Sequence, residues 1–113
     1  MDIKERVVDG VSVLDLSGKM VLGEGDMQIR DRIKDLLADG QRKILLNMGD
    51  VSYVDSAGLG ALISSYTTTK REGGQLKLVH LTRRIQDLLA ITKLITVFDT
   101  YDSETEAIDS FSK

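Results

Sequence analysis

Strand and helix patterns alternate along this chain after a single hairpin turn, and this order restricts its fold. Asp9-Gly10 is a pairing that tight hairpins favour, because both central residues of such a turn need positive φ. Short strands are expected on either side of it, over residues 3–8 and 11–16. The later elements are expected in the order helix 26–38, strand 43–48, helix 56–71, strand 75–79, helix 82–90, strand 96–98 and helix 103–111. This alternation predicts an α/β domain with a mixed, mostly parallel sheet of about four to five strands, packed by about four helices.

Apolar spacing and terminal residues define the first helix and the segments around it. Its predicted buried stripe consists of Ile29, Ile33, Leu36 and Leu37. Asp26 is expected at its N-cap, and Gly40 is expected to stop it. Residues 18–25 are expected to form a glycine-punctuated loop, and Gly49-Asp50 is expected to form a turn. The apolar phase slips between Val13 and Leu14, which indicates either a bulge or a strand buried on both faces.

Two later helices, predicted over residues 56–71 and 103–111, show comparable signals. The helix over residues 56–71 is predicted to bury one face, made of Leu59, Leu62, Ile63 and Tyr66, and to end at Gly73-Gly74. The last helix begins with Ser-Glu-Thr-Glu, in which Ser103 and Glu106 have the spacing of a capping box.

Length and composition exclude several classes of protein. The 113 residues suit one domain over residues 1–113, and the 42% apolar fraction supports a packed core. No apolar run approaches the roughly 18–20 residues of a membrane helix, and no apolar secretory region follows Met1. The chain has no cysteine, so it has no disulfide framework. These features predict a cytoplasmic protein without membrane insertion. A net charge of −3, with few aromatic residues, argues against direct nucleic-acid binding.

Residues 54–60, Val-Asp-Ser-Ala-Gly-Leu-Gly, depart from the usual composition of a helix start. Gly58 and Gly60 fall in the first turns, where each glycine costs about 1 kcal/mol relative to alanine. In one interpretation, Asp55 or Ser56 caps the helix and the glycines let a neighbouring strand approach closely. In the other, the helix start displays the Ser56 hydroxyl and the glycines leave its surroundings sterically open. Spacing and composition favour neither interpretation.

The hexapeptide Asp55-Ser56-Ala57-Gly58-Leu59-Gly60, preceded by an apolar strand and an acidic turn, resembles the signature of STAS domains. Within that group it is most similar to the single-domain anti-sigma factor antagonists. The resemblance covers nearly the whole chain, because the hairpin, the glycine-rich loop, the strands and the helices occur in the family's order. One position departs from the pattern: relatives often have Gly-x-Leu-Asp after the second strand, whereas this chain has Gly18-Lys19-Met20-Val21.

The resemblance implies a regulatory binding protein and not an enzyme. In that family, the serine after the aspartate is phosphorylated by a partner anti-sigma factor that is itself an ATP-dependent serine/threonine kinase. Ser56 has this position, and Ala57 removes the second hydroxyl that many relatives carry. The unphosphorylated protein binds the anti-sigma factor and releases the sigma factor, and a separate serine phosphatase restores the serine. ATP and Mg²⁺ belong to the kinase, so no cofactor and no metal are expected here.

The same resemblance suggests which residues contact the partner. The expected contact residues are Asp55, Ser56, Ala57, Gly58, Leu59, Gly60, Lys19, Met20 and Val21. Met20, Val21 and the neighbouring Leu22 either join this surface or fold onto the core. A phosphoserine carries about −1.5 to −2 charges, so modification of Ser56 would bring the net charge from −3 to about −5. We expect this charge to act locally at the interface, without refolding the domain.

Other functions are less well supported by the residues. A serine hydrolase needs a base beside its serine, but the chain has one histidine, His80, and Val54 occupies the place of the first glycine of a nucleophile elbow. The hydroxyl residues within 64–69 are expected to form a solvated helix face. One alternative is a non-catalytic STAS subunit of a signalling scaffold or of a transporter ATPase complex. Another is a receiver domain phosphorylated on Asp50 or Asp55, although the acidic pair that usually follows the first strand of receivers is missing.

Overall fold

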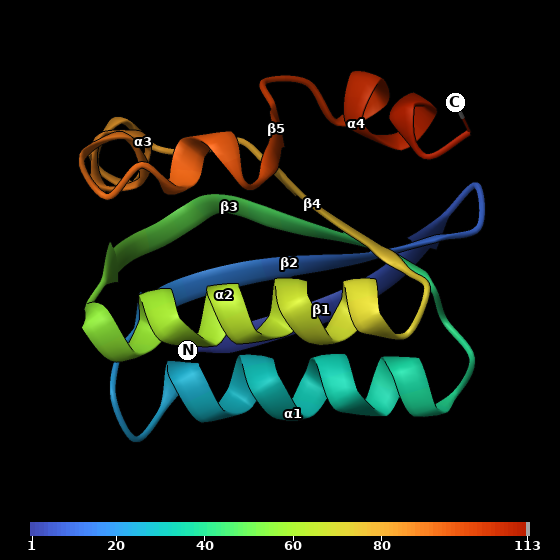
Figure 1. Cartoon of the computed structure of the whole chain (residues 1–113), viewed down its shortest axis with the longest axis horizontal. Helices are drawn as coiled ribbons and strands as arrows, with labels where there is room; N and C mark the ends of the chain where they lie inside the picture. Colours follow the sequence, from blue (N-terminus) through green and yellow to red (C-terminus); the bar gives the residue numbers. More distant parts are fainter. Residues whose placement is uncertain (113) are drawn as a thin grey trace.

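Residues 1–112, which the computed structural model describes, form a five-stranded sheet with helices on both faces (Figure 1). The strands are β1 (Asp2–Val8), β2 (Val11–Met20), β3 (Lys43–Val54), β4 (Gln75–Val79) and β5 (Asp99–Tyr101). The helices are α1 (Gly25–Ala38), α2 (Ser56–Arg71), α3 (Arg83–Ile91), the 3₁₀ turn η1 (Leu94–Thr96) and α4 (Glu104–Ser110). In Figure 1, α1 and α2 lie side by side on one face of the sheet, and α4 lies on the opposite face.

The sheet has the mixed topology that the element order predicts. Its strands are arranged in the order β1-β2-β3-β4-β5, in which β1 and β2 are antiparallel and the other pairs are parallel. The α/β prediction is therefore confirmed. The apolar slip in β2 has a direct explanation, because Leu14 packs toward α1 and α2 whereas Val13 packs toward α4. β2 is thus a strand buried on both faces.

Two strands are longer than predicted. β2 continues to Met20 and β3 continues to Val54, so the expected loop from residue 18 and the expected turn at Gly49-Asp50 are both wrong at these positions. The pairing register shifts between Asp15 and Ser17 and again between Gly18 and Lys19, as it does at β-bulges. A bulge accommodates turn-type residues inside a strand, which is why the turn signal was misleading here.

Helix and strand ends differ from the predictions in two further places. α1 begins at Gly25, with Glu24 at the N-cap position, and Asp26 lies inside the helix, where its Oδ1 accepts from Glu24 N and Met27 N. The last strand was expected at residues 96–98, but this region contains η1, and β5 follows at Asp99–Tyr101. Other end signals are confirmed. Gly40 has φ +86° after α1, and Ser103 Oγ caps α4 at 3.3 Å from Glu106 N.

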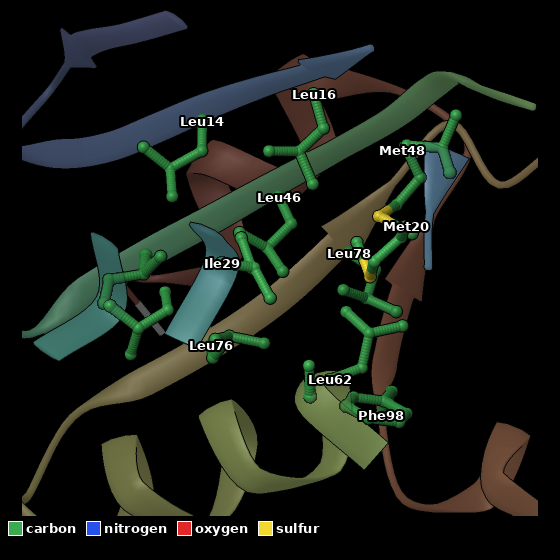
Figure 2. Close-up of a cluster of buried hydrophobic side chains, with 14 of the residues drawn as sticks. Leu14, Leu16, Met20, Ile29, Leu46, Met48, Leu62, Leu76, Leu78 and Phe98 are labelled. Carbon is green, nitrogen blue, oxygen red and sulfur yellow. The ribbon is translucent and has the colours of Figure 1, made fainter. Parts of the chain in front are cut away.

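The core consists of two apolar clusters separated by the sheet. The larger cluster packs α1, α2 and α3 against the sheet, and Figure 2 shows Leu14, Leu46 and Leu78 pointing toward Ile29 and Leu62. The smaller cluster lies under α4 and includes Val11, Val13, Leu45, Val79, Ala107, Ile108 and Phe111. Complete burial of one such leucine contributes roughly 1.5–3 kcal/mol. The larger cluster includes Val51 and Val54, so it holds the end of β3 in place. Within residues 1–112, no helix is both long enough and apolar enough to span a membrane.

Candidate functional site

The strand-to-helix junction between β3 and α2 presents the candidate serine at the surface. β3 ends at Val54, Asp55 follows in an extended conformation as the N-cap, and Ser56 is the first residue of α2. Ser56 is exposed, whereas Val54 is buried. Figure 1 shows this junction at one end of the sheet, beside the start of α1. The Ser56 hydroxyl is therefore within reach of an approaching protein.

Asp55 uses both of its carboxylate oxygens to hold the junction together. Its Oδ1 accepts from Gly58 N at 2.8 Å, and its Oδ2 accepts from Leu22 N at 3.0 Å. The hydrogen bond from the Gly58 amide, followed by the one from Leu22, lowers the pKa of Asp55 below its usual value. The Asp55 amide in turn donates to the Met20 carbonyl at 3.3 Å. Asp55 thus joins the segment after β2 to the first turn of α2.

The two signature glycines have different structural roles. A Cβ atom on Gly58 would lie 2.0 Å from the Met20 carbonyl oxygen, a distance that two such atoms cannot reach. A Cβ atom on Gly60 would meet only Arg30 Nη2, at 3.7 Å, which is ordinary contact. Close approach of β2 therefore explains Gly58, as in the first of the two interpretations above. Packing does not explain Gly60.

The predicted contact residues differ in how far they reach the surface. Lys19 and Ser56 are exposed, while Val21, Asp55, Ala57, Leu59 and Gly60 are half-buried. Gly58 is buried, and Met20 is fully buried in the core. The structure brings the two predicted segments together, because the backbone of Met20 contacts both Asp55 and Gly58. The Met20 side chain belongs to the core and supports the site from below, so it offers no surface to a partner.

Several exposed apolar residues near the junction were not predicted as site residues. Leu22 is 75% exposed and Met27, in the first turn of α1, is 56% exposed. Tyr53 is also exposed, and it pairs with Lys19 across β2 and β3. Ile63 was expected to face inward but is 37% exposed, on the same side of α2 as Ser56 because the two are seven residues apart. Strand alternation would not have revealed Tyr53, because it places Tyr53 on the face of the buried Val51, and the alternation is interrupted before Val54, which is buried as well.

A separate group of polar side chains lies on the sheet around Asp15. Arg6 pairs with Asp15 at 2.7 Å and also with Glu104, which ties β1 to the start of α4. The hydrogen bond from Arg6 lowers the pKa of Asp15. Asn47 donates to Asp15 Oδ1 at 2.9 Å, and its Oδ1 lies 3.2 Å from His80 Nδ1. Among the residues that the structure describes, no group of three or more histidine and acidic side chains is arranged to hold a metal ion.

Comparisons with known proteins identify a family and a shared fold. The family model described as "STAS domain" matches residues 2–107. The anti-sigma-B factor antagonist of Bacillus subtilis is 38% identical over 63 residues, which cover 56% of this chain and 58% of that protein. The anti-sigma-B factor antagonist of Listeria monocytogenes is 28% identical over 110 residues, which cover 94% of this chain and 91% of that protein. The solved structure of the Bacillus cell fate determinant SpoIIAA in its phosphorylated form matches with a TM-score of 0.74 and 22% sequence identity. The match covers 96% of this chain and 98% of that one, and it shows a shared fold.

Proposed function

Because this chain belongs to the STAS domain family, we propose that it is a cytoplasmic anti-sigma factor antagonist controlled by phosphorylation of Ser56. In its unphosphorylated form it binds an anti-sigma factor that is a serine/threonine kinase, and this binding frees a sigma factor. With its own Mg²⁺ bound, the kinase transfers the γ-phosphoryl group of its ATP to the Ser56 hydroxyl, which releases ADP and the hydroxyl proton, and the complex dissociates. A serine phosphatase then restores the hydroxyl. The relatives named as anti-sigma factor antagonists support this assignment.

The observation that carries the proposal is the exposed Ser56 hydroxyl on a junction that is otherwise fully constrained. Asp55 already caps α2, so Ser56 is not needed for that purpose. Gly58 lets the end of β2 pack against the first turn, and Asp55 fixes Leu22 to the same turn. An acceptor hydroxyl must enter the active site of a kinase in a defined geometry, and a rigid junction provides this.

Electrostatics explain how one phosphate releases a partner. A phosphoserine at position 56 adds about −1.5 to −2 charges beside the carboxylate of Asp55. The start of a helix stabilises an anion by roughly 0.3–1 kcal/mol, which offsets part of this repulsion, so the fold is retained. At an interface the dianion has to lose its water shell or meet like charge. A penalty of about 2.8 kcal/mol there weakens binding a hundredfold.

The exposed apolar side chains near Ser56 supply the attraction in the unphosphorylated state. Leu22 lies between β2 and α1, and Met27 lies in the first turn of α1. Tyr53 lies on β3, and Ile63 lies on α2. Methionine and aromatic residues are enriched at the centres of protein interfaces. A partner that covers these side chains also covers Ser56, so the added charge falls inside the contact area.

Phosphosite mapping in the presence of the cell's own kinases tests the proposal. The purified chain is incubated with an ATP-replete extract of its source cells and analysed by mass spectrometry, together with Ser56→Ala and with Thr67→Ala as an exposed hydroxyl control on the same helix. We expect one phosphate on the wild type and on Thr67→Ala, and none on Ser56→Ala. Labelling that persists in Ser56→Ala would refute the assignment. Co-purification with a transporter ATPase, in place of a kinase of the GHKL type, would favour the role of a non-catalytic subunit.

A further inference from the structure

Arg30 of α1 extends its guanidinium group to the surface of α2 beside the second signature glycine. A Cβ atom on Gly60 would meet only Arg30 Nη2, at 3.7 Å. A side chain larger than alanine at this position would therefore compete with the guanidinium for space. Core packing does not explain Gly60, but the absence of a side chain there leaves the surface of α2 open to Arg30.

The guanidinium lies on the side of α2 that carries Ser56. Gly60 follows Ser56 by four residues, so the two are neighbours on the helix surface, with Cβ positions about 5–6 Å apart. Figure 1 shows α1 and α2 running in the same direction. Side chains on an α-helix lean toward its N-terminus, so Arg30 leans toward the end of the helix pair at which Ser56 lies.

Arg30 has no ionic partner in the unphosphorylated chain. It is exposed, and none of the ion pairs formed within residues 1–112 includes it. Asp31 is its neighbour on α1 but does not face it, because consecutive helical residues point in different directions. The carboxylate of Asp55 is occupied by the amides of Gly58 and Leu22. The guanidinium is thus free to pair with a new anion.

The other hydroxyl groups of α2 lie farther along the helix, on Ser64, Ser65, Thr67, Thr68 and Thr69. Ser65 and Thr69 are buried, so the expectation of a solvated hydroxyl face over 64–69 is wrong for these two. Thr67 is exposed, but it follows Gly60 by seven residues, a rise of about 10 Å. Ser56 is therefore the exposed hydroxyl of α2 that lies closest to Gly60.

We propose that Arg30 binds the phosphate of phosphorylated Ser56 and holds it against the first turns of α2. The pair presupposes the proposed function, since it forms only after Ser56 is modified. A planar guanidinium can donate two parallel N–H bonds to phosphate oxygens, and this bidentate contact fixes the orientation of the phosphate. It also offsets the repulsion between the phosphate and the carboxylate of Asp55. Arg30 is thus a positioning residue for the phosphorylated state.

The pair makes the change in surface charge larger than the loss of one neutral hydroxyl suggests. Before modification, the side chains of Arg30 and Ser56 together carry a charge of about +1. A phosphoserine adds about −1.5 to −2 charges, so the same two side chains then carry about −0.5 to −1. A partner that covers them meets a free cation before phosphorylation and a fixed net negative charge afterwards.

Phosphorus-31 NMR of the full chain with phosphoserine at position 56 tests the pair. The phosphoserine is inserted during translation, so the sample does not depend on the cell's kinase, and a failure here is distinct from a failure of the proposed function. The second ionisation of phosphoserine has a pKa of about 6. We expect this pKa to be lower by about 0.5 or more when Arg30 is present than in Arg30→Gln, because a nearby cation favours the dianion.

Lys34→Gln is the matched control for this measurement. Lys34 is an exposed cation on the same side of α1, one turn farther from Ser56, and salt at about 0.15 M largely screens its charge at that distance. Lys34→Gln should leave the phosphate pKa unchanged. Equal changes in Lys34→Gln and Arg30→Gln, or no change in Arg30→Gln, would overturn the proposal.

Two substitutions of Gly60 test the path of the guanidinium across α2. Gly60→Leu places a large side chain where Arg30 Nη2 lies, so the phosphate pKa should rise to its value in Arg30→Gln although the arginine is still present. Gly60→Ala leaves room for the guanidinium and should keep the pKa low. A pKa that stays low in Gly60→Leu would show that Arg30 does not bind the phosphate across Gly60, and it would overturn the proposal.

Melting temperatures separate the ionic pair from a structural role of Arg30. The phosphate at Ser56 should lower the melting temperature more in Arg30→Gln than in the chain that retains Arg30, because only the latter offsets the repulsion from Asp55. A purely structural role of Arg30 would lower the melting temperature of both forms equally and leave the effect of the phosphate unchanged. An equal effect of the phosphate in the two backgrounds would contradict the proposed pair.

Discussion

The first turns of α1 and α2 pack against the same stretch of backbone but present different surfaces. A Cβ atom on Gly25 would lie 2.6 Å from the Lys19 carbonyl oxygen, and one on Gly58 would lie 2.0 Å from that of Met20. Both helices therefore start with a glycine in contact with the end of β2. α1 has no side-chain cap, whereas Asp55 caps α2 and leaves Ser56 exposed beside it. The comparison shows that the glycine serves packing in both helices and that the exposed serine is what sets α2 apart.

Substitution of Gly58 or Gly25 by alanine tests whether both glycines are needed for packing against β2. These variants should show the largest changes in the free energy of unfolding. Gly58→Ala forces the Met20 carbonyl away, so we expect it to lower the free energy of unfolding by about 3 kcal/mol or more. Gly25→Ala creates a longer contact, 2.6 Å against 2.0 Å, and should cost less, about 2 kcal/mol. Urea denaturation followed by circular dichroism measures both. A larger loss for Gly25→Ala would contradict the order of the two contacts.

Asp55 caps α2, whereas α1 has no side-chain cap, and removal of the Asp55 carboxylate tests how much this cap contributes. The pKa of Asp55 is lowered in the folded state by its hydrogen bonds from Gly58 and Leu22. Its contribution to stability is therefore complete above the unfolded pKa of about 3.9 and is lost as the pH falls through the lower, folded value. We expect Asp55→Asn to reduce stability at pH 7 and to flatten the dependence on pH below about 4. Melting temperatures between pH 2 and pH 7 would show this.

The matched change at Asp26 provides the control for that prediction. Asp26 accepts hydrogen bonds from Glu24 N and Met27 N but does not join two segments of the chain. Asp26→Asn should leave the position of Leu22 unchanged, whereas Asp55→Asn should alter its amide resonance, because Leu22 N donates to Asp55. Loss of the Leu22 contact in both variants would show that Asp55 has no special role in the junction.

These contrasts also show which parts of the structure can be derived from sequence. The bounds of α2 follow from its apolar spacing, its acidic cap and the terminal glycines, all of which are local signals. The continuation of β3 through Gly49 and Asp50 depends on the pairing of Asp50 with Ser17 and of Val51 with Gly18, residues that lie far away in the sequence. Gly58 is conspicuous in the sequence, but its reason is a contact with Met20 that only the tertiary structure reveals. Local patterns thus placed Ser56 at the start of a helix and the family resemblance singled it out, while the packing that supports it required coordinates.

Gly60 should give a smaller effect, of opposite sign, because nothing packs tightly against it. Gly60→Ala removes the backbone freedom of a helical glycine and adds a Cβ atom with room, 3.7 Å from Arg30 Nη2. We expect an increase in the free energy of unfolding of about 0.5–1 kcal/mol. Chemical denaturation of this variant and of Gly58→Ala compares the two changes in the free energy of unfolding directly. A loss of stability at position 60 similar to that at position 58 would mean that both glycines are packing residues.

The smallest effect on stability is expected at Ser56 itself. Its side chain is exposed and Asp55 already caps the helix, so Ser56→Ala should change the free energy of unfolding by less than about 0.5 kcal/mol. Thermal unfolding measures this change, with Ser103→Ala as a control. Ser103 caps α4, so its loss should cost about 1 kcal/mol. A cost at Ser56 as large as that at Ser103 would show that Ser56 is a capping residue.

The most direct test of the central claim compares the affinity of the partner kinase for the two forms of the chain. The kinase that modifies Ser56 is titrated by calorimetry into the unphosphorylated protein and into the protein phosphorylated on Ser56, while ¹⁵N spectra monitor the fold. We expect phosphorylation to weaken binding about a hundredfold, with amide shifts confined to residues near the start of α2. Equal affinities, or spectral changes spread across the sheet and α4, would contradict a local electrostatic switch at this junction.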